Sequence, residues 1–291
     1  MMNNVIFYGE KCPQNLILAL GYFDAVHKGH QKVLKKAVQV AKLKGFTPST
    51  LIFTGGKGGL DVFTLSERLR RIFLLGIQTV IVKELTPEFM SLDKAKFLSE
   101  LSSLYDIKAV VSGSDFTFGK NALGNVCTLK DFFGDTNVYT QDLEELSGEK
   151  ISTTKIKKAL QDGDVLTVNT LLDGNYFISG EVVKGKGLGV NLGFPTANVL
   201  LSDNKYPIKS GVYVTFTVIG GAIYPSITNV GAQPTVGGKD RIIETYIDGF
   251  NGDLYGKSLT VYFVERLRDI VKFNSIKELK EQLEKDLRSI R

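Results

Sequence analysis

The chain has 291 residues, of which 43% are hydrophobic and 23% charged, the balance of an ordinary globular protein with enough length for two domains. Its net charge of +5 is too small and too dispersed to indicate a nucleic-acid-binding protein by itself. Cys12 and Cys127 form neither a disulfide framework nor a C-x-x-C metal motif, and no stretch is long enough to span a bilayer. We therefore expect a cytoplasmic protein without a signal peptide, and neither a membrane nor nucleic acid among its partners.

In the first half, strand-like and helix-like segments alternate. Apolar, β-branched runs predict strands over residues 15–20, 48–53, 78–83 and 108–112, and patterns of helical period predict helices over 30–44, 64–75 and 93–104. Gly45 and Gly76 are placed to end the first two helices. Such alternation predicts a mostly parallel sheet with helices on both faces, in which ligands bind at the carboxyl ends of the strands.

From Tyr176 onward the pattern changes. The β-branched and aromatic runs are short and separated by Gly, Asn and Pro, and they cover residues 176–183, 211–218, 222–224 and 259–264. This spacing favours a small antiparallel barrel or sandwich. A final helix starts at Ser275, and we expect its apolar stripe to be core packing; the stripe consists of Ile276, Leu279, Leu283, Leu287 and Ile290. The change of pattern places a domain boundary at 173/174, which gives domains 1–173 and 174–291.

The two histidines of the chain lie together in the run Gly21-Tyr-Phe23-Asp24-Ala-Val-His27-Lys-Gly-His30. This run joins a predicted strand to the start of a helix, where free backbone N–H groups and the helix dipole favour anions. His27 and His30 are three residues apart, so both imidazoles can point at one ligand. The H-x-G-H pattern resembles the triphosphate-holding motif of adenylyl- and cytidylyltransferases. The alternative is a chance pair of surface histidines.

Two further segments are candidates for the same nucleotide site. Residues 112–125 form a polar, Gly-rich loop that leaves a strand end and carries Asp115 and Asn125. Residues 151–157 combine hydroxyls with cations ahead of a helix: Ser152, Thr153, Thr154 and Lys157. Hydroxyls followed by a cation suit the β- and γ-phosphates of a nucleotide, although Ser and Thr at a helix start are often simple N-caps. The reaction inferred is adenylyl transfer, in which a phosphate attacks the α-phosphorus of ATP and pyrophosphate leaves.

The second half contains a glycine-rich run, residues 185–198, that includes Gly185 and Gly187. The run ends in Pro-Thr196-Ala-Asn198, whose hydroxyl and amide oxygens are hard ligands of the kind that Mg²⁺ prefers. Glu244 stands in an otherwise apolar strand, where a carboxylate is costly unless it has a task. The alternative is that Glu244 is an exposed strand residue without a catalytic role.

Taken together, these segments resemble the bacterial bifunctional riboflavin kinase/FAD synthetase family, in the family's order and over essentially the whole chain. The matching segments of the first half are 21–30, 115–119 and 152–157, and those of the second half are 192–198, 211–213, 229–235, 244–245, 253–256 and 266–273. The resemblance implies an α/β protein with an N-terminal Rossmann-like nucleotidyltransferase domain, which makes FAD from FMN and ATP. It also implies a C-terminal six-stranded antiparallel barrel, which makes FMN from riboflavin and ATP.

The resemblance also implies roles for individual residues. Thr196 and Asn198 are expected to bind Mg²⁺ and phosphate, and Glu244 is expected to be the general base of the kinase. His27, His30 and the 152–157 segment are expected to hold ATP. The remaining expected cofactor-binding residues are Gly21, Phe23, Asp24, Asp115, Asn125, Gly185, Gly187 and Arg266, with Asp115 and Asn125 around the flavin. Weak self-association is compatible with the resemblance.

The chain departs from the family pattern at several positions, which are Ala25, the segment 54–59, Lys157, Val190, Gly249 and Asn274. These departures leave a second hypothesis, a monofunctional FAD synthetase whose barrel is a weak kinase or a regulatory module. A third hypothesis, a flavin-binding regulator acting on RNA or DNA, is supported only by the mild basicity.

Overall fold

The computed structural model describes residues 3–55, 59–142, 145–146, 148–185, 194–231 and 241–290. The chain divides into two compact units. Unit 1 comprises residues 1–59 and 65–153, and unit 2 comprises 60–64 and 154–291. This division differs from the boundary expected at 173/174, because two helices and the short internal segment 60–64 group with the barrel. No helix in the described ranges is long and apolar enough to cross a membrane.

Unit 1 is built on a six-stranded sheet in the order β1-β4-β3-β2-β5-β6, in which every neighbouring pair is parallel. The strands are β1 (Asn4–Phe7), β2 (Leu16–Leu20), β3 (Thr47–Thr54), β4 (Thr79–Glu84), β5 (Ile107–Gly113) and β6 (Val138–Gln141). The helices are α1 (Lys28–Lys44), α2 (Leu65–Leu74), α3 (Pro87–Met90), α4 (Lys94–Leu104) and α5 (Val126–Phe133), with 3₁₀ turns η1 (Lys120–Ala122) and η2 (Asp135–Asn137) and a small hairpin of β7 (Glu145–Leu146) and β8 (Glu149–Lys150). The predicted parallel α/β architecture is confirmed.

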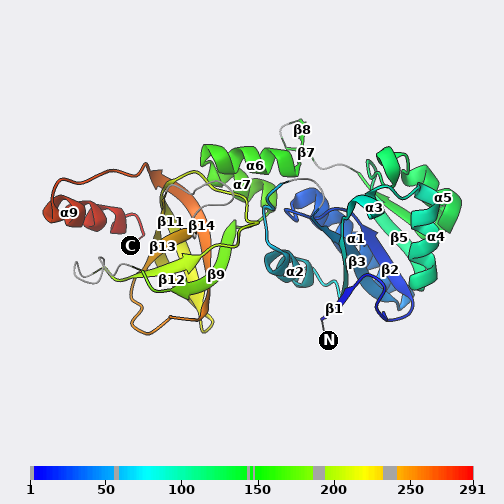
Figure 1. The fold of residues 1–291 in the computed structure, drawn as a ribbon, viewed down its shortest axis with the longest axis horizontal. Helices are drawn as coiled ribbons and strands as arrows, with labels where there is room; N and C mark the ends of the chain where they lie inside the picture. The colour runs from blue at the N-terminus through cyan, green and yellow to red at the C-terminus, as the bar shows by residue number, and fades with distance from the viewer. Residues whose placement is uncertain are drawn as a thin grey trace. The chain divides into compact units, whose positions relative to one another are not determined.

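Helices cover both faces of this sheet (Figure 1). Ile17 and Ala19 of β2 pack in one cluster with α1 and α2, and Leu18 and Leu20 pack in another with α4 and α5. All five residues of β2 are buried, as expected for a central strand covered twice. Gly45 ends α1 in the left-handed conformation, with φ 71°, as the sequence predicts. The carboxyl ends of the strands therefore meet at one edge of the sheet, which is the edge where the site lies.

Unit 2 contains a closed antiparallel barrel in the order β10-β13-β12-β11-β14-β9. Of the two architectures that the sequence left open, the barrel is therefore confirmed and the sandwich is wrong. Its strands are β9 (Phe177–Val183), β10 (Thr196–Leu200), β11 (Gly211–Ile219), β12 (Ala222–Val230), β13 (Ile242–Ile247) and β14 (Ser258–Arg268). Two helices precede the barrel, α6 (Thr153–Asp162) and α7 (Val165–Leu172), and α9 (Ile276–Leu287) follows it. Asn169 of α7 donates its side-chain N–H to the Phe263 carbonyl of β14 at 3.0 Å, which fixes α7 to the barrel.

The barrel interior carries hydroxyl groups as well as apolar side chains. The Thr228 hydroxyl lies 2.8 Å from that of Thr215 and 3.0 Å from that of Thr245, and all three residues are buried. Because side chains alternate along a strand, the neighbours of Thr228 and Thr245 on β12 and β13 lie on the outer face of the wall. Burial of the interior positions thus assigns Asn229 and Glu244 to the outside of the barrel.

The closing helix α9 is present, but the expectation that its whole apolar stripe is core packing is wrong. Leu287 is buried and packs on Val212, Val214 and Ile227 of the barrel wall. Ile276, at the other end of the helix, is 71% exposed. The stripe meets the barrel only through the last turns of α9.

Candidate functional sites in the two units

The first site is formed where β2 turns into α1. Gly21 is required there, because a Cβ at this position would lie 2.7 Å from the Phe23 ring. The Phe23 side chain folds back over Gly21 and is buried. Phe23 and Val26 have φ of 49° and 47°, an uncommon conformation for such residues, and strain of this kind clusters at functional sites. The turn places His27 at the N-cap of α1.

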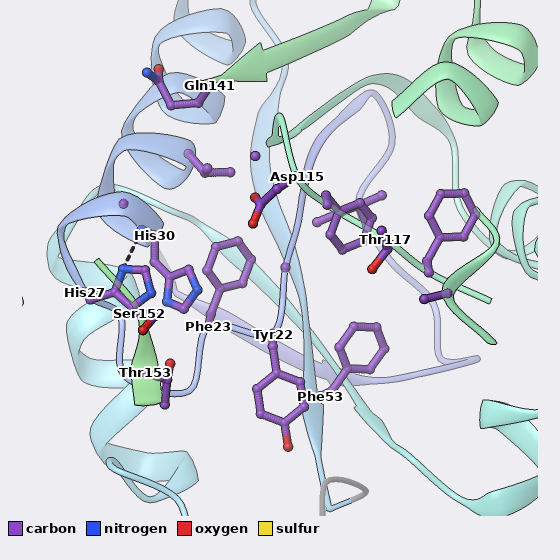
Figure 2. Close-up of a pocket in the computed structure, with 18 of the residues that line it drawn as sticks. Tyr22, Phe23, His27, His30, Phe53, Asp115, Thr117, Gln141, Ser152 and Thr153 are labelled. Carbon is purple, nitrogen blue, oxygen red and sulfur yellow. Dashed lines mark hydrogen bonds between the residues drawn. The ribbon is translucent and has the colours of Figure 1, made fainter. Parts of the chain in front are cut away.

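His27 and His30 lie side by side on this turn. The His27 Nδ1 accepts a hydrogen bond from the His30 backbone N–H at 3.3 Å, and the two ring centroids are 3.6 Å apart. Both rings face the same cavity (Figure 2). The His30 Nδ1 is buried and has no hydrogen-bond partner among the described residues, so it has capacity for a ligand.

Both imidazoles are neutral at physiological pH. Burial, and then the positive charge of Lys150, lowers the pKa of His27 to about 4. Burial also holds the pKa of His30 well below its usual value, and the proximity of the titratable His27 and of the cationic Lys150 lowers it further. Neutral rings stack without repulsion and can donate N–H groups to phosphate oxygens.

The cavity in unit 1 has a volume of about 600 Å³ and lies at the carboxyl edge of the sheet. One side is polar, with His27, His30, Ser152 and Thr153 together with Asp115, which forms an ion pair with Lys150. The other side is aromatic, formed by Tyr22, Phe53, Phe89, Phe116 and Phe118. Such a cavity accepts a ligand that has a planar apolar part and a charged part.

Tyr22 links the aromatic side of the cavity to the loop after β3. Its hydroxyl donates to the Gly55 carbonyl at 2.8 Å, and its ring stacks on Phe53 with centroids 6.5 Å apart. The aromatic side was not predicted from the sequence, because its five members come from four separate segments of the chain. Residues 56–58 of the 54–59 segment, in which the chain departs from the family pattern, lie outside the described residues.

Four residues expected at this site are not among those lining the cavity. Asn125 caps α5, and its Oδ1 accepts the Thr128 backbone N–H at 3.1 Å. Asp24 is buried behind the turn. Thr154 and Lys157 belong to unit 2. There the Lys157 Nζ donates to the Leu60 carbonyl at 2.6 Å.

The second site is a row of polar side chains on the outer wall of the barrel. Asn198 of β10 pairs directly with Glu244 of β13, and Glu244 pairs on its other side with Asn229 of β12. Directly opposed residues in antiparallel strands lie on the same face, so the three side chains form one row. Thr196 lies two residues from Asn198, on the same face of β10.

Two observations make this row a candidate ligand site. A Cβ on Gly185 would lie 2.4 Å from the Asn198 Nδ2, so only glycine permits the backbone to approach this amide. The Asn229 Oδ1 is buried and has no hydrogen-bond partner in the described part of the chain. Hard oxygen donors of this type, Thr196 Oγ1 and Asn198 Oδ1 among them, fit a Mg²⁺ ion that keeps waters and phosphate oxygens as its other ligands. Gly187 lies outside the described residues.

A smaller cavity of about 390 Å³ lies on the same outer face, between the barrel and α9. It is lined by Phe194, Tyr246, Glu284, Leu287 and Arg288. Tyr246 is directly paired with Thr196, so the cavity adjoins the polar row. Phe194, Tyr246 and Leu287 can contact a planar ring, and Glu284 and Arg288 add charged groups to the same lining.

Arg266, expected from the resemblance to be a cofactor-binding residue, makes contacts within unit 2. Its guanidinium donates to the Ser210 carbonyl at 2.8 Å and forms an ion pair with Asp269. A Cβ on Gly163 would lie 2.6 Å from the Arg266 Cδ, so this side chain packs against the turn between α6 and α7. The side chain is thus occupied in joining that turn to the barrel.

Two family models match the chain, one described as FAD synthetase over residues 9–155 and one as riboflavin kinase over residues 172–291. A bifunctional riboflavin kinase/FMN adenylyltransferase of Bacillus subtilis is 36% identical over 284 residues, covering 93% of this chain and 90% of that protein. The protein of the same description from Escherichia coli K12 is 31% identical over 290 residues, covering 95% and 92%. A crystal structure from Streptococcus pneumoniae, described as a macrolide-efflux protein, matches with a TM-score of 0.88 at 30% identity over 99% of this chain and 98% of that one.

The class of protein is therefore a transferase of two units, with one candidate phosphate-binding site in each. Both family models match and together they cover nearly the whole chain. The chain belongs to the family of bifunctional riboflavin kinase/FMN adenylyltransferases. The resemblance read from the sequence motifs is confirmed.

Proposed function

We propose that this chain phosphorylates riboflavin to FMN in unit 2 and adenylylates FMN to FAD in unit 1, with ATP as the co-substrate of both reactions. The observation that carries the proposal is that each unit has its own site: the His27–His30 pair in one and the Asn198–Glu244–Asn229 row in the other. Its substrates are small molecules, and two free cysteines suit a cytoplasmic enzyme. The boundary between the adenylyltransferase domain and the kinase domain is proposed near 173/174.

In unit 1, the neutral imidazoles of His27 and His30 and the hydroxyls of Ser152 and Thr153 bind the phosphates of ATP, while the aromatic side holds the flavin ring. An oxygen of the FMN phosphate attacks the α-phosphorus, the bond to the β-phosphate breaks, and pyrophosphate leaves. The attacking phosphate is already ionised, so no general base is needed. The protein contributes position and charge neutralisation.

In unit 2, the oxygen of the ribityl hydroxyl attacks the γ-phosphorus of ATP, and ADP leaves. The Glu244 carboxylate takes the proton of that hydroxyl during the attack. Thr196 and Asn198 are the residues that would hold Mg²⁺, which when bound neutralises phosphate charge. The cavity beside Tyr246 and Leu287 holds the flavin ring. The exposed position of Glu244 on the strand leaves its carboxylate accessible to substrate.

The test is chromatographic separation of flavins from two reactions with Mg-ATP, one started from riboflavin and one from FMN. The unmodified protein should form FMN and then FAD in the first, and FAD in the second. Glu244→Gln should abolish FMN formation and leave FAD formation from supplied FMN intact, since only the kinase needs this base. His30→Ala should do the reverse.

Glu265→Gln is the matched control, because Glu265 is an exposed strand glutamate of the same barrel and should tolerate the change in both reactions. Equal loss of both activities in Glu244→Gln would refute separate sites. Formation of FAD only from supplied FMN by the unmodified protein would establish the monofunctional alternative. Absence of product from both substrates would refute the proposal.

A further inference from the structure

The last turns of α9 hold this helix on the barrel. Asp286 is 3% exposed and Leu287 6% exposed, whereas Ile276 in the first turn is 71% exposed. Between them, Leu279 and Leu283 are only half-buried. Among the described residues of α9, the buried side chains are thus those of the last turn, Asp286 and Leu287.

Among these contacts is a two-pronged ion pair. Arg268, at the end of β14, donates from Nε to the Asp286 Oδ1 at 3.0 Å and from Nη2 to the Oδ2 at 2.6 Å. Gln282, one turn earlier on α9, donates to the same Oδ1 at 2.7 Å. A guanidinium that meets a carboxylate through two hydrogen bonds fixes the orientation of both groups as well as their distance.

The same two turns of α9 form a wall of the smaller cavity. Glu284, Leu287 and Arg288 line it from the end of the helix, and Phe194, just before β10, and Tyr246 of β13 line it from the other side. A displacement of the last turns of α9 would move three of these five residues together. The width of the cavity is thus set by whatever fixes the C-terminal end of α9.

We propose that the Arg268–Asp286 pair is the positioning element of the riboflavin site: it acts through α9 by holding the helix wall of the cavity at the distance that the flavin ring requires. Neither side chain touches the reacting atoms. This inference rests on the proposed function, which places the flavin ring in this cavity.

The test is steady-state kinase kinetics of the full chain carrying Asp286→Asn, Arg268→Gln or both. Each single variant should raise the KM for riboflavin about tenfold, a size that corresponds to losing one well-formed contact. The KM for ATP, kcat at saturating riboflavin and FAD formation from FMN should change little. Because the two side chains act as one pair, the double variant should be no worse than either single variant.

Lys277→Gln is the matched control on the same helix, since it removes an exposed ion pair with Glu281, 4.0 Å long, and neither residue lines the cavity. It should leave the KM for riboflavin unchanged. Arg268→Lys keeps the charge without the two-pronged geometry and should give an intermediate KM. This variant decides the matter if Asp286→Asn fails to fold.

A fourth variant separates this inference from the proposed function. Tyr246→Ala alters the barrel wall of the cavity and should also raise the KM for riboflavin. If Tyr246→Ala raises it and Asp286→Asn leaves it unchanged, the positioning role is wrong. If Tyr246→Ala leaves it unchanged, the flavin ring lies elsewhere and the proposed site itself is wrong. A uniform fall of kcat with unchanged KM in the pair variants would also overturn the inference, since it indicates a loss of folded protein.

Discussion

His27 combines two tasks that conflict at low pH. Its Nδ1 caps α1 by accepting the His30 N–H, which requires a neutral nitrogen, and its ring faces a cavity that suits anions. Burial secures the neutral form by lowering the pKa to about 4. The unfolded chain has no such burial and binds a proton at about pH 6.5.

The stability of unit 1 should therefore depend on pH between these two values. As the pH falls from about 6.5 to about 4, the unfolded chain gains a proton at His27 that the folded chain does not, so the folded state loses stability by about 1.4 kcal/mol per pH unit. The loss is absent above pH 6.5, where both states are neutral. His27→Asn keeps a good N-cap without a titrating group, and should flatten this part of the curve.

Urea unfolding of both proteins, followed by circular dichroism at several pH values between 7 and 4, measures the difference. Carboxylates that titrate in the same range are common to both proteins and cancel. Parallel curves for the unmodified chain and His27→Asn would contradict the assignment.

Individual residues also show which parts of the candidate sites could be predicted from the sequence. The paired histidines, Asp115 and Ser152 were found because they belong to short contiguous motifs, and all line the cavity. Lys157 is close to these motifs in sequence, but its Nζ is bound to a backbone carbonyl in unit 2. Asn229 was noted only as part of the matching run 229–235. Its place beside Glu244 depends on the register between β12 and β13, and the sequence alone does not fix that register.

At the scale of elements, helix α5 shows how a polar residue near a site can serve the helix alone. Asn125 and Thr128 cap the helix reciprocally, with side chains accepting backbone N–H groups at 3.1 Å and 3.4 Å. Asn125→Ala should lower the free energy of unfolding of unit 1 by about 1 kcal/mol and leave the KM for FMN unchanged. Asn125→Ser, which retains a capping oxygen, should recover most of the stability.

Thermal unfolding and adenylyltransferase kinetics on the same preparations decide between the two roles of Asn125. A higher KM for FMN with unchanged stability would show that this side chain contacts the flavin, as the resemblance implies. The flavin role was implied by the family resemblance, and the place of Asn125 in the polar loop after β5 was compatible with it. Only the structure shows that the side chain is already engaged at the helix terminus.

Elements differ in how well the sequence predicts them. The ends of the four central strands of unit 1 were predicted to within one residue, because continuous apolar runs bounded by Gly and polar residues are distinctive. The edge strands β1 and β6 were not predicted, since both are short and partly exposed. The α9 stripe was over-interpreted: amphipathic periodicity predicts a helix and its apolar face, but it does not say how much of that face is covered.

At the scale of the whole chain, the two units are interleaved in sequence. Residues 60–64 belong to unit 2 although they lie between two parts of unit 1. Phe63 is fully buried there, with its ring 4.9 Å from that of Phe177 and 5.6 Å from that of Tyr176. The Lys205 Nζ lies 4.7 Å from the centroid of the Phe63 ring. No composition change marks this segment, so a sequence-based division into 1–173 and 174–291 assigns it to the first domain.

Phe63→Ala should therefore destabilise the barrel unit, by about 3–5 kcal/mol for the loss of a fully buried ring. On heating, kinase activity should be lost at a lower temperature than in the unmodified chain, and adenylyl transfer should be affected much less. Ile223→Ala is the matched control, because Ile223 is 69% exposed on the same barrel. Loss of adenylyl transfer alone would show that Phe63 stabilises unit 1 instead.

The interleaving of the segment 60–64 also has a consequence for synthesis on the ribosome. Phe63 leaves the ribosome long before Tyr176, Phe177 and Lys205, which follow it by more than a hundred residues. At ordinary elongation rates this interval lasts on the order of ten seconds. The strands and helices of unit 1 can form in that time, but the segment must remain as an unpaired apolar loop of the nascent chain. Unit 2 therefore completes its folding only when the segment 60–64, synthesised well before the barrel, packs against it.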